Sequence, residues 1–530
     1  PFSALRRPKK KKKKHHKKKH HKKPVAAAPP PATAAPPTPP APPVTGGPAV
    51  DTTAPRDLPA ADRHLLRRFS AGITPALAQA VTDAGSARAW FAAQLDPAGV
   101  ADPDGDSVAA WFPTLQRDAA TIFQRQVDDV QGSWEVMEDL SRWTVTRRIH
   151  STRQVQELMV DFWSNLLHVP LNGDPAVFWR VDYDQMIRRY ALTTFEDLLR
   201  NAITHPAMGL NLSNAVSTKD APNENLGREL LELHTVGVGT YTEADVKASA
   251  RMLTGYRVDV WWPSFRSFYD TTWHDATPVT VMGFTDPNGS ADGRASTTKY
   301  LKYLAHHPAT AQRIARRLAV KFVRDDPSDS LVNAVAGAYL DSGTAIKTTL
   351  LALVDHPDFA AAAGLKVRMP LEDYVAMVRG LGITLQQPTR EESFAKAMHW
   401  QYSDAGQAPY DWPAPNGFPE VNAAWSSAGR VLTSFALHRV MAAHWWPNEG
   451  AVLPELTSYF PPLPATLQTV IDTVGLRVLG QAPGPQISQG IATLVGMSLS
   501  ANVTASKASQ DWFVIGMVAS LLDSPLHLHR

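Results

Sequence analysis

The chain divides into three zones of very different composition, and only the last can build a hydrophobic core. Residues 1–23 contain 11 Lys, 2 Arg and no acidic residue, and like charges at this density repel one another and keep a chain extended. Residues 24–56 contain 12 Pro, mixed mainly with Ala and Thr, which favours a semi-rigid polyproline-type spacer. The composition therefore predicts a disordered Lys/His-rich arm (1–23), a Pro/Ala-rich linker (24–56) and a folded domain (57–530).

The positive net charge of the chain comes from the arm alone. The total is +3, so the residues after position 23 carry a net charge of −10. A body of that sign repels phosphate, which argues against sequence-specific nucleic-acid binding. The arm suits attachment to an anionic surface, such as a cell-wall polymer or lipid headgroups. The alternative is that it is only a solvated, low-complexity tail.

Residue types that are missing exclude several classes of protein. The chain has no Cys, which removes disulfides, zinc ribbons, iron–sulfur clusters and thiol nucleophiles. A bound metal would have to use oxygen and imidazole ligands. No apolar run approaches the ~20 residues of a membrane helix. Serine-elbow hydrolase, zincin, P-loop and dinucleotide-binding motifs are also missing from the sequence.

The pattern from about residue 58 onward is helical. In Ser151–His168 the apolar residues recur at helical spacing, and Ser151 with Gln154 has the form of a capping box. The segment Tyr256–Gly283 is the exception, because β-branched and aromatic residues crowd there between prolines. We predict a mainly α fold: one large multi-helix domain with a short aromatic-rich β-hairpin or loop insertion.

The densest group of reactive side chains lies between Asn223 and His234. At 100° per residue, Asn225, Arg228, Glu229 and Glu232 share one face of a helix. Glu229 and Glu232 could hold a divalent cation or act as an acid/base pair, with Arg228 binding an anionic substrate group. The alternative is an exposed ladder of ion pairs around Arg228.

His234 extends this group to an acid–acid–histidine pattern. On a regular helix it lies about 160° around from Glu232, so it joins the acids only if the helix ends near Leu233. Otherwise it borders the apolar side, where a core histidine bonded to a carbonyl is expected.

Two further segments carry candidate binding residues. On the predicted helix Ser151–His168, Asn165 and His168 fall on a polar stripe that either faces a ligand or is an ordinary solvated face. In the aromatic segment, Trp273, His274 and Asp275 place an imidazole beside a carboxylate on a loop, where function is often found.

These motifs resemble a bacterial family known as domain of unknown function 1800. The resemblance covers most of residues 60–430, which we treat as the family-like core, with residues 431–530 as a helical C-terminal part. It rests on the following stretches: 64–68, 72–75, 162–165, 223–239, 241–246, 253–256, 274–275, 307–311, 322–323 and 366–371.

The resemblance implies a large, mainly helical and usually exported protein without an assigned reaction. Relatives tend to show Phe-Trp-His-Asn-His-Phe where this chain has Phe-Trp-Ser-Asn-Leu-Leu from Phe162. If the two lost imidazoles bind metal in the family, this chain has lost that site or has replaced it with His168.

Two functions are compatible with these observations. The first is an exported, metal-assisted hydrolase acting on an envelope or extracellular polymer. In it, Glu229, Glu232, His234, His274 and Asp275 would hold a divalent metal, while substrate binding would fall to Asn225, Trp273, Asn165 and His168. The second is a non-catalytic scaffold that binds polysaccharide or the cell envelope, in which the polar helix is a buried network. Both place the protein outside the cytoplasm or at the cell surface.

Overall fold

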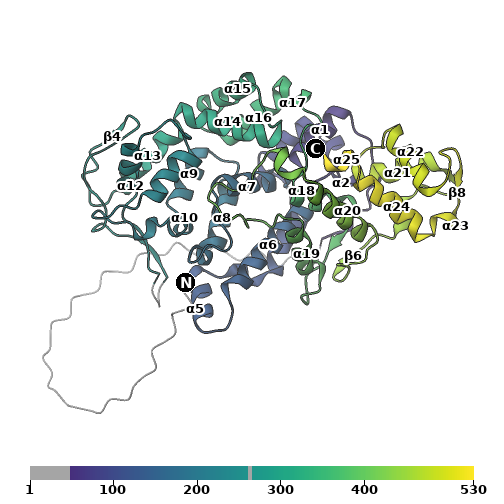
Figure 1. Ribbon diagram of the computed structural model, residues 1–530, viewed down its shortest axis with the longest axis horizontal. Helices are drawn as coiled ribbons and strands as arrows, with labels where there is room; N and C mark the ends of the chain where they lie inside the picture. Colours follow the sequence, from purple (N-terminus) through teal and green to yellow (C-terminus); the bar gives the residue numbers. More distant parts are fainter. Residues whose placement is uncertain (1–47, 261–264) are drawn as a thin grey trace, which may run out of the picture. The chain divides into compact units, whose positions relative to one another are not determined.

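The computed structural model describes residues 48–260 and 265–530, and they belong to one compact unit (Figure 1). The described residues are 59% helical, and the sheets among them have only two strands each. The predicted mainly α fold is confirmed. The Lys/His arm (1–23) and residues 24–47 of the linker lie outside the described residues. Within the described part, no helix combines the length and apolar character needed to cross a bilayer.

The α-helices of the described residues follow one another along the chain. Their bounds are α1 (Ala60–Phe69), α2 (Pro75–Asp83), α3 (Ala87–Gln94), α4 (Pro103–Ser107), α5 (Ala119–Val127), α6 (Ser133–His150), α7 (Gln154–Leu166), α8 (Arg180–Tyr190), α9 (Phe195–Ile203), α10 (Pro206–Asn211), α11 (Glu224–Glu229), α12 (Glu243–Met252), α13 (Arg294–Ala305), α14 (Pro308–Phe322), α15 (Asp329–Asp341), α16 (Ile346–Asp355), α17 (Pro357–Ala361), α18 (Pro370–Gly380), α19 (Phe394–Asp404), α20 (Ala428–Ala442), α21 (Leu467–Leu479), α22 (Pro485–Val495), α23 (Ala505–Ala508), α24 (Asp511–Leu522) and α25 (Pro525–Leu528).

Shorter elements complete the fold. A π-helical turn, η6 (Leu230–His234), continues α11. The 3-10 turns are η1 (Pro97–Gly99), η2 (Val108–Trp111), η3 (Pro113–Gln116), η4 (Ala176–Trp179), η5 (Asn214–Val216), η7 (Asn422–Trp425) and η8 (Leu456–Tyr459). The strands are β1 (Tyr256–Val258), β2 (Ser267–Tyr269), β3 (Val279–Val281), β4 (Phe284–Asp286), β5 (Thr384–Leu385), β6 (Ala451–Val452), β7 (Ala465–Thr466) and β8 (Asn502–Val503).

The aromatic insertion folds as two small antiparallel hairpins. Strand β1 pairs with β2 so that Tyr256 faces Tyr269, and β3 pairs with β4 so that Val279 faces Asp286. Phe265, between the first two strands, is 1% exposed and stacks against Phe123 with ring centroids 4.7 Å apart. The predicted hairpin therefore exists, and a second one follows it.

Two hydrophobic clusters hold the helices together. In the first, Phe69 of α1 stacks on Phe322 of α14 at 4.5 Å, and the cluster includes buried residues of α7, α9, α15 and α16. Figure 1 shows α14, α15 and α16 side by side. The second cluster joins α6, α18, α21 and α24, with Tyr374 and Phe513 among its fully enclosed rings. Burial of this much apolar surface supplies the main driving force for folding.

The start of α7 differs from the prediction. The helix begins at Gln154, and Ser151 is the C-cap of α6. The Ser151 hydroxyl donates to Asp102 Oδ2 at 2.7 Å, and Gln154 Nε2 donates to the Ser151 carbonyl at 2.6 Å. The capping-box prediction was wrong because the two residues stabilise the turn between α6 and α7 instead of capping α7.

One row of buried charges runs from α6 through α7 to α8. Arg147 Nε and Arg188 Nη1 both donate to Glu157 Oε1, at 3.0 and 2.6 Å, and Arg147 also pairs with Asp102 at 3.3 Å. Burial alone would raise the pKa of Glu157, but the guanidinium groups of Arg188 and Arg147 hold that pKa below its usual value.

A second row begins at the next residue of α6 and reaches the last residue of the chain. Arg148 pairs with Asp161 at 2.7 Å, and Lys321 lies 3.5 Å from Asp161 and 3.0 Å from Glu372. Arg530 completes the row at 3.1 Å from Glu372. Glu157 and Asp161 of the α7 stripe are therefore paired with cations from other helices, so this part of the stripe is not an ordinary solvated face.

We expect Glu157→Gln to lower the free energy of unfolding by about 3–5 kcal/mol, because it leaves two buried guanidinium groups without their shared carboxylate. Urea denaturation followed by circular dichroism measures the loss. Glu392→Gln, at an exposed position, is the matched control and should stay within about 0.5 kcal/mol of wild type. Equal stability of the two variants would contradict a structural role for the row.

Candidate functional site

The structure brings two of the predicted catalytic residues together. Glu229 ends α11 and Glu232 lies in η6, and both side chains are half-buried. Burial and the neighbouring Glu232 carboxylate raise the pKa of Glu229. Tyr241 donates its hydroxyl proton to Glu232 Oε2 at 2.6 Å, and burial together with this bond raises the pKa of Tyr241 to about 12. This is a carboxylate pair with one phenol as its hydrogen-bond donor.

Arg228 is engaged by other acids on the same surface. Its Nη1 and Nη2 atoms donate to the two carboxylate oxygens of Glu243 at 2.6 and 2.7 Å, and Nη2 also donates to Glu224 at 3.3 Å. Asn225 is exposed on the first turn of α11. An ion-pair ladder was the alternative that the sequence left open, and the structure has one in which Arg228 pairs with Glu224 and Glu243.

His234 points away from the two glutamates into the core. It is 0% exposed, and its Nδ1 lies 3.0 Å from the Leu166 carbonyl. Thr235 donates to the Leu230 carbonyl, and the backbone N–H of Gly237 to the Leu231 carbonyl. A π-helical turn has more residues per turn than an α-helix, so it changes which side chains share a face.

Asn165 and His168 lie together at the end of α7, and both are held by one loop. Asn165 exchanges two hydrogen bonds with the backbone of Phe418, at 2.9 and 2.6 Å. His168 Nε2 lies 2.7 Å from the Trp412 carbonyl. Burial lowers the pKa of His168 to about 4. Both residues thus anchor the 412–418 loop against α7.

The three loop residues of the insertion also have structural partners. His274 is bonded on both ring nitrogens, at 3.1 Å to the Thr254 carbonyl and 3.0 Å to Asn288 Oδ1. Asp275 pairs with Arg251 at 2.7 Å. The Trp273 ring lies under the Arg257 guanidinium, 3.2 Å from it. Asp275 thus fastens the insertion to α12, while Trp273 packs against Arg257 of β1 and His274 joins Thr254 to Asn288.

The predicted metal ligands do not assemble in the described residues. Neither Glu229, Glu232, His234, His274 nor Asp275 belongs to a group of three acidic or histidine residues whose ligand atoms are close enough to share an ion in that part of the chain. Their catalytic and metal-binding roles stay predictions, and only Glu229 and Glu232 are neighbours.

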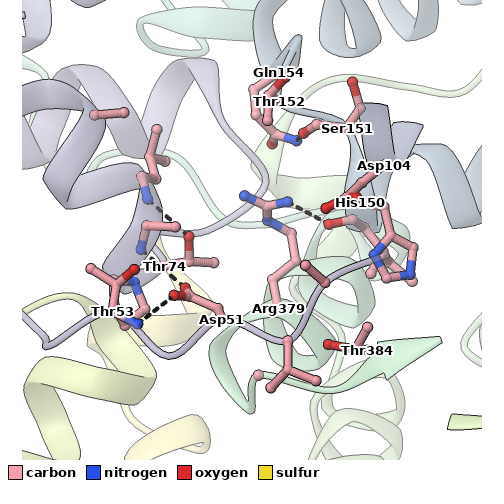
Figure 2. Close-up of a pocket in the computed structure, with 18 of the residues that line it drawn as sticks. Asp51, Thr53, Thr74, Asp104, His150, Ser151, Thr152, Gln154, Arg379 and Thr384 are labelled. Atoms are coloured by element: carbon pink, nitrogen blue, oxygen red, sulfur yellow. Dashed lines mark hydrogen bonds between the residues drawn. The ribbon is translucent and has the colours of Figure 1, made fainter. Parts of the chain in front are cut away.

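A cavity that the sequence did not indicate lies elsewhere, where α2, α3, the end of α6 and the end of α18 meet (Figure 2). Its volume is about 630 Å³, within the range of small-molecule sites. Most of its wall is apolar. The apolar lining includes Val50, Pro75, Leu77, Ala80, Ala84, Trp90, Ala93, Val100, Ile149 and Ile383.

Two arginines line this cavity, Arg379 at the end of α18 and Arg477, whose guanidinium lies over the Tyr459 ring. One guanidinium nitrogen of Arg379 donates to the Ile149 carbonyl, and the buried Nε has no hydrogen-bond partner. Among the described residues, no carboxylate forms an ion pair with Arg379 within 4.0 Å. Burial lowers the pKa of Arg379 to about 10, so the group stays charged at neutral pH.

Polar groups surround this cation at a distance. Asp51 Oδ1 and Oδ2 accept from the backbone N–H groups of Thr53 and Ala76, at 2.9 and 3.0 Å. Figure 2 shows Arg379 between this loop and the end of α6 at His150. The N–H of Leu385 donates to His150 Nε2 at 3.2 Å, and burial lowers the pKa of His150 to about 3. The ring is therefore neutral, so the cationic groups of the cavity are the guanidinium groups of Arg379 and Arg477.

Sequence reasoning missed this cavity because its walls come from distant segments. The only local signal is Arg379 itself, which follows an apolar run in α18 and precedes Gly380. Nothing in that run identifies the α2 and α6 residues that face it.

Comparison with known families decides what kind of protein this is. The family model described as Protein of unknown function (DUF1800) matches residues 64–528. The chain belongs to this family. The resemblance drawn from the sequence motifs is confirmed, and the match extends past residue 430 to the last helices.

The DUF1800 assignment adds a family but no reaction. Neither the curated proteins nor the solved structures include a match to the chain. The pair Glu229/Glu232 and Arg379 lie within the DUF1800 match, whereas residues 49–53 of the cavity wall precede it.

The contacts of the two glutamates lead to different expectations. We expect Glu229→Gln to change the free energy of unfolding by less than about 1 kcal/mol, because it removes a charge from a like-charged pair at a half-buried site. Glu232→Gln should cost about 1 kcal/mol, since Tyr241 then bonds to a neutral oxygen. Thermal melts with and without Mg²⁺, Mn²⁺ or Zn²⁺ measure both. Stabilisation by a cation that Glu229→Gln abolishes would instead support the predicted metal role.

Proposed function

We propose that this DUF1800 protein is a non-catalytic binding protein whose ligand is a small amphipathic anion held in the cavity around Arg379. The observation that carries the proposal is a guanidinium group that faces a mainly apolar cavity without a paired carboxylate. Asp51 and Asp102 interact with Arg379 only at longer range, and a buried cation without a directly paired carboxylate is costly. An anionic ligand group would remove that cost on binding.

The walls indicate the rest of the ligand. Leu77, Trp90, Ile149 and Ile383 offer an apolar surface, so the body of the ligand is expected to be apolar. The hydroxyl groups of Thr53, Thr74 and Thr384 provide a few directional hydrogen bonds. Apolar walls with few polar anchors are typical of small-molecule sites.

The arm and linker give this binding protein a means of attachment. The 11 Lys of residues 1–23 would hold it at an anionic cell-wall polymer or lipid headgroups. We therefore propose an extracytoplasmic or cell-surface location, in line with the export that the resemblance implies.

A metal-assisted hydrolase remains the second candidate, and the pair Glu229/Glu232 favours it. Two half-buried carboxylates beside the Tyr241 hydroxyl can bind a hydrated Mg²⁺ ion or exchange protons. It has less support because His234, His274 and Asp275 are engaged elsewhere.

Laurate, a carboxylate on a 12-carbon chain, tests the binding proposal by isothermal titration calorimetry. We expect saturable binding with one site per chain. Arg379→Gln should weaken it by about ten- to a hundredfold, the equivalent of about 1.5–3 kcal/mol for a hydrogen bond to a charged group. Arg390→Gln, at an exposed position, is the matched control.

Two variants of α3 test whether laurate occupies the cavity. Ala93 is exposed and lines the cavity, while Ala89 is exposed on the same helix outside it. Ala93→Trp should abolish binding by filling the space, and Ala89→Trp should leave it unchanged. Laurate binding that survives both Arg379→Gln and Ala93→Trp would refute the proposed site.

A further inference from the structure

Three side chains from different helices converge below the surface near the C-terminus. They are Asp373 of α18, His438 of α20 and His527 of α25, and one ligand atom from each lies within 4.8 Å of the other two. All three side chains are at most 4% exposed. None was a candidate from the sequence, because 65 and 154 residues separate the histidines from Asp373.

One carboxylate oxygen is the meeting point. Asp373 Oδ1 lies 3.0 Å from His438 Nε2 and 2.8 Å from His527 Nε2. The two imidazole rings are nearly perpendicular, with centroids 5.1 Å apart. The same nitrogen of each ring thus faces one point, as it does when two histidines share a metal ion.

The surrounding contacts orient each of these groups. His438 Nδ1 lies 2.8 Å from Asp523 Oδ1, so a carboxylate holds the far side of the ring. Asp373 Oδ2 accepts from Ser434 Oγ at 2.6 Å and from Arg430 Nη2 at 3.2 Å. Asp373 Oδ1 is left to face the histidines. A carboxylate behind a ligating histidine is the usual arrangement around protein-bound zinc.

We propose that Asp373, His438 and His527 form a binding site for one Zn²⁺ ion. Zinc commonly takes imidazole nitrogen and carboxylate oxygen ligands, at about 2.0–2.2 Å. Tetrahedral geometry at those bond lengths separates neighbouring ligand atoms by about 3.3 Å. The observed separations of 3.0 and 2.8 Å need to open by only a few tenths of an ångström on each side.

The ion would tie the C-terminal helices to the rest of the domain. It would link α25, which carries His527, to α18 and α20, while Asp523 at the end of α24 supports His438. A site this deeply buried suits a structural ion, and binding to the folded state alone raises stability.

The Lys/His arm contains four further histidines, and His-rich tracts are typical of metal binding. The test therefore uses the full chain with His15, His16, His20 and His21 replaced by Gln, stripped with chelator and reloaded. Elemental analysis after dialysis against Zn²⁺ should give one ion per chain, and zinc should raise the melting temperature. His527→Gln and His438→Gln should each lose the ion.

His444 provides the matched control. His438 lies within α20, and His444 lies two residues after the end of this helix. His444 belongs to no three-residue ligand group in the described part of the chain. His444→Gln should keep the ion.

A variant that gains a spectroscopic signal on metal binding keeps the proposal testable if the Gln variants do not fold. Since the chain has no Cys, His527→Cys places a single thiolate at this position. Loading that variant with Co²⁺ should produce a sulfur-to-cobalt charge-transfer band in the near ultraviolet, together with tetrahedral visible bands. The His444→Cys variant should show no such band.

The outcomes separate the alternatives. One zinc per chain that depends on His438 and His527, or the thiolate–cobalt band in His527→Cys, supports the site. No zinc retained by the arm-substituted protein overturns the proposal, and so does zinc that persists in folded His527→Gln. In that event the cluster is a hydrogen-bonded carboxylate between two histidines.

Discussion

Ion pairs buried between helices are the constraint on which this fold depends. Arg147 and Arg148 are neighbours on α6, yet each begins a separate row of charges, through Glu157 and through Asp161. A buried charge is tolerated only when its partners are in place, because removing one partner leaves the other uncompensated. The rows therefore require α6, α7, α8, α14 and α18 to meet in one arrangement. The apolar clusters drive collapse, while the charge rows select among the packings that collapse would allow.

Much of the fold could be predicted from the sequence, because helical periodicity and strand composition are local properties. The helix around Phe162 and the hairpins of the aromatic insertion both followed from patterns shorter than thirty residues. The family also followed from motifs such as that between Asn223 and Gly239. These features can be predicted without knowing which remote segments of the chain pack against them.

The sites could not be predicted to the same extent, because their partners are remote in sequence. The sequence allowed the polar stripe of α7 to be interpreted as a solvated face, because its counterions Arg188 and Lys321 lie on other helices. His234 is an exception, because the projection at 100° per residue already put it on the apolar side, where it bonds to the Leu166 carbonyl. Arg379 and Asp373 both lie on α18. Only the tertiary structure shows that Arg379 faces a cavity and that Asp373 faces two histidines.

The wall of the cavity at Val50 and Asp51 has a mechanical consequence. Both residues belong to the last part of the Pro/Ala-rich linker (24–56), and Asp51 accepts a hydrogen bond from the N–H of Ala76 in α2. Tension on the tether would reach these residues before any other part of the folded domain. If ligand binding in the cavity stabilises this wall, then pulling on the tether weakens ligand binding, and ligand binding resists the pull, as linkage requires. Attachment through the arm and ligand binding in the cavity would then be thermodynamically coupled.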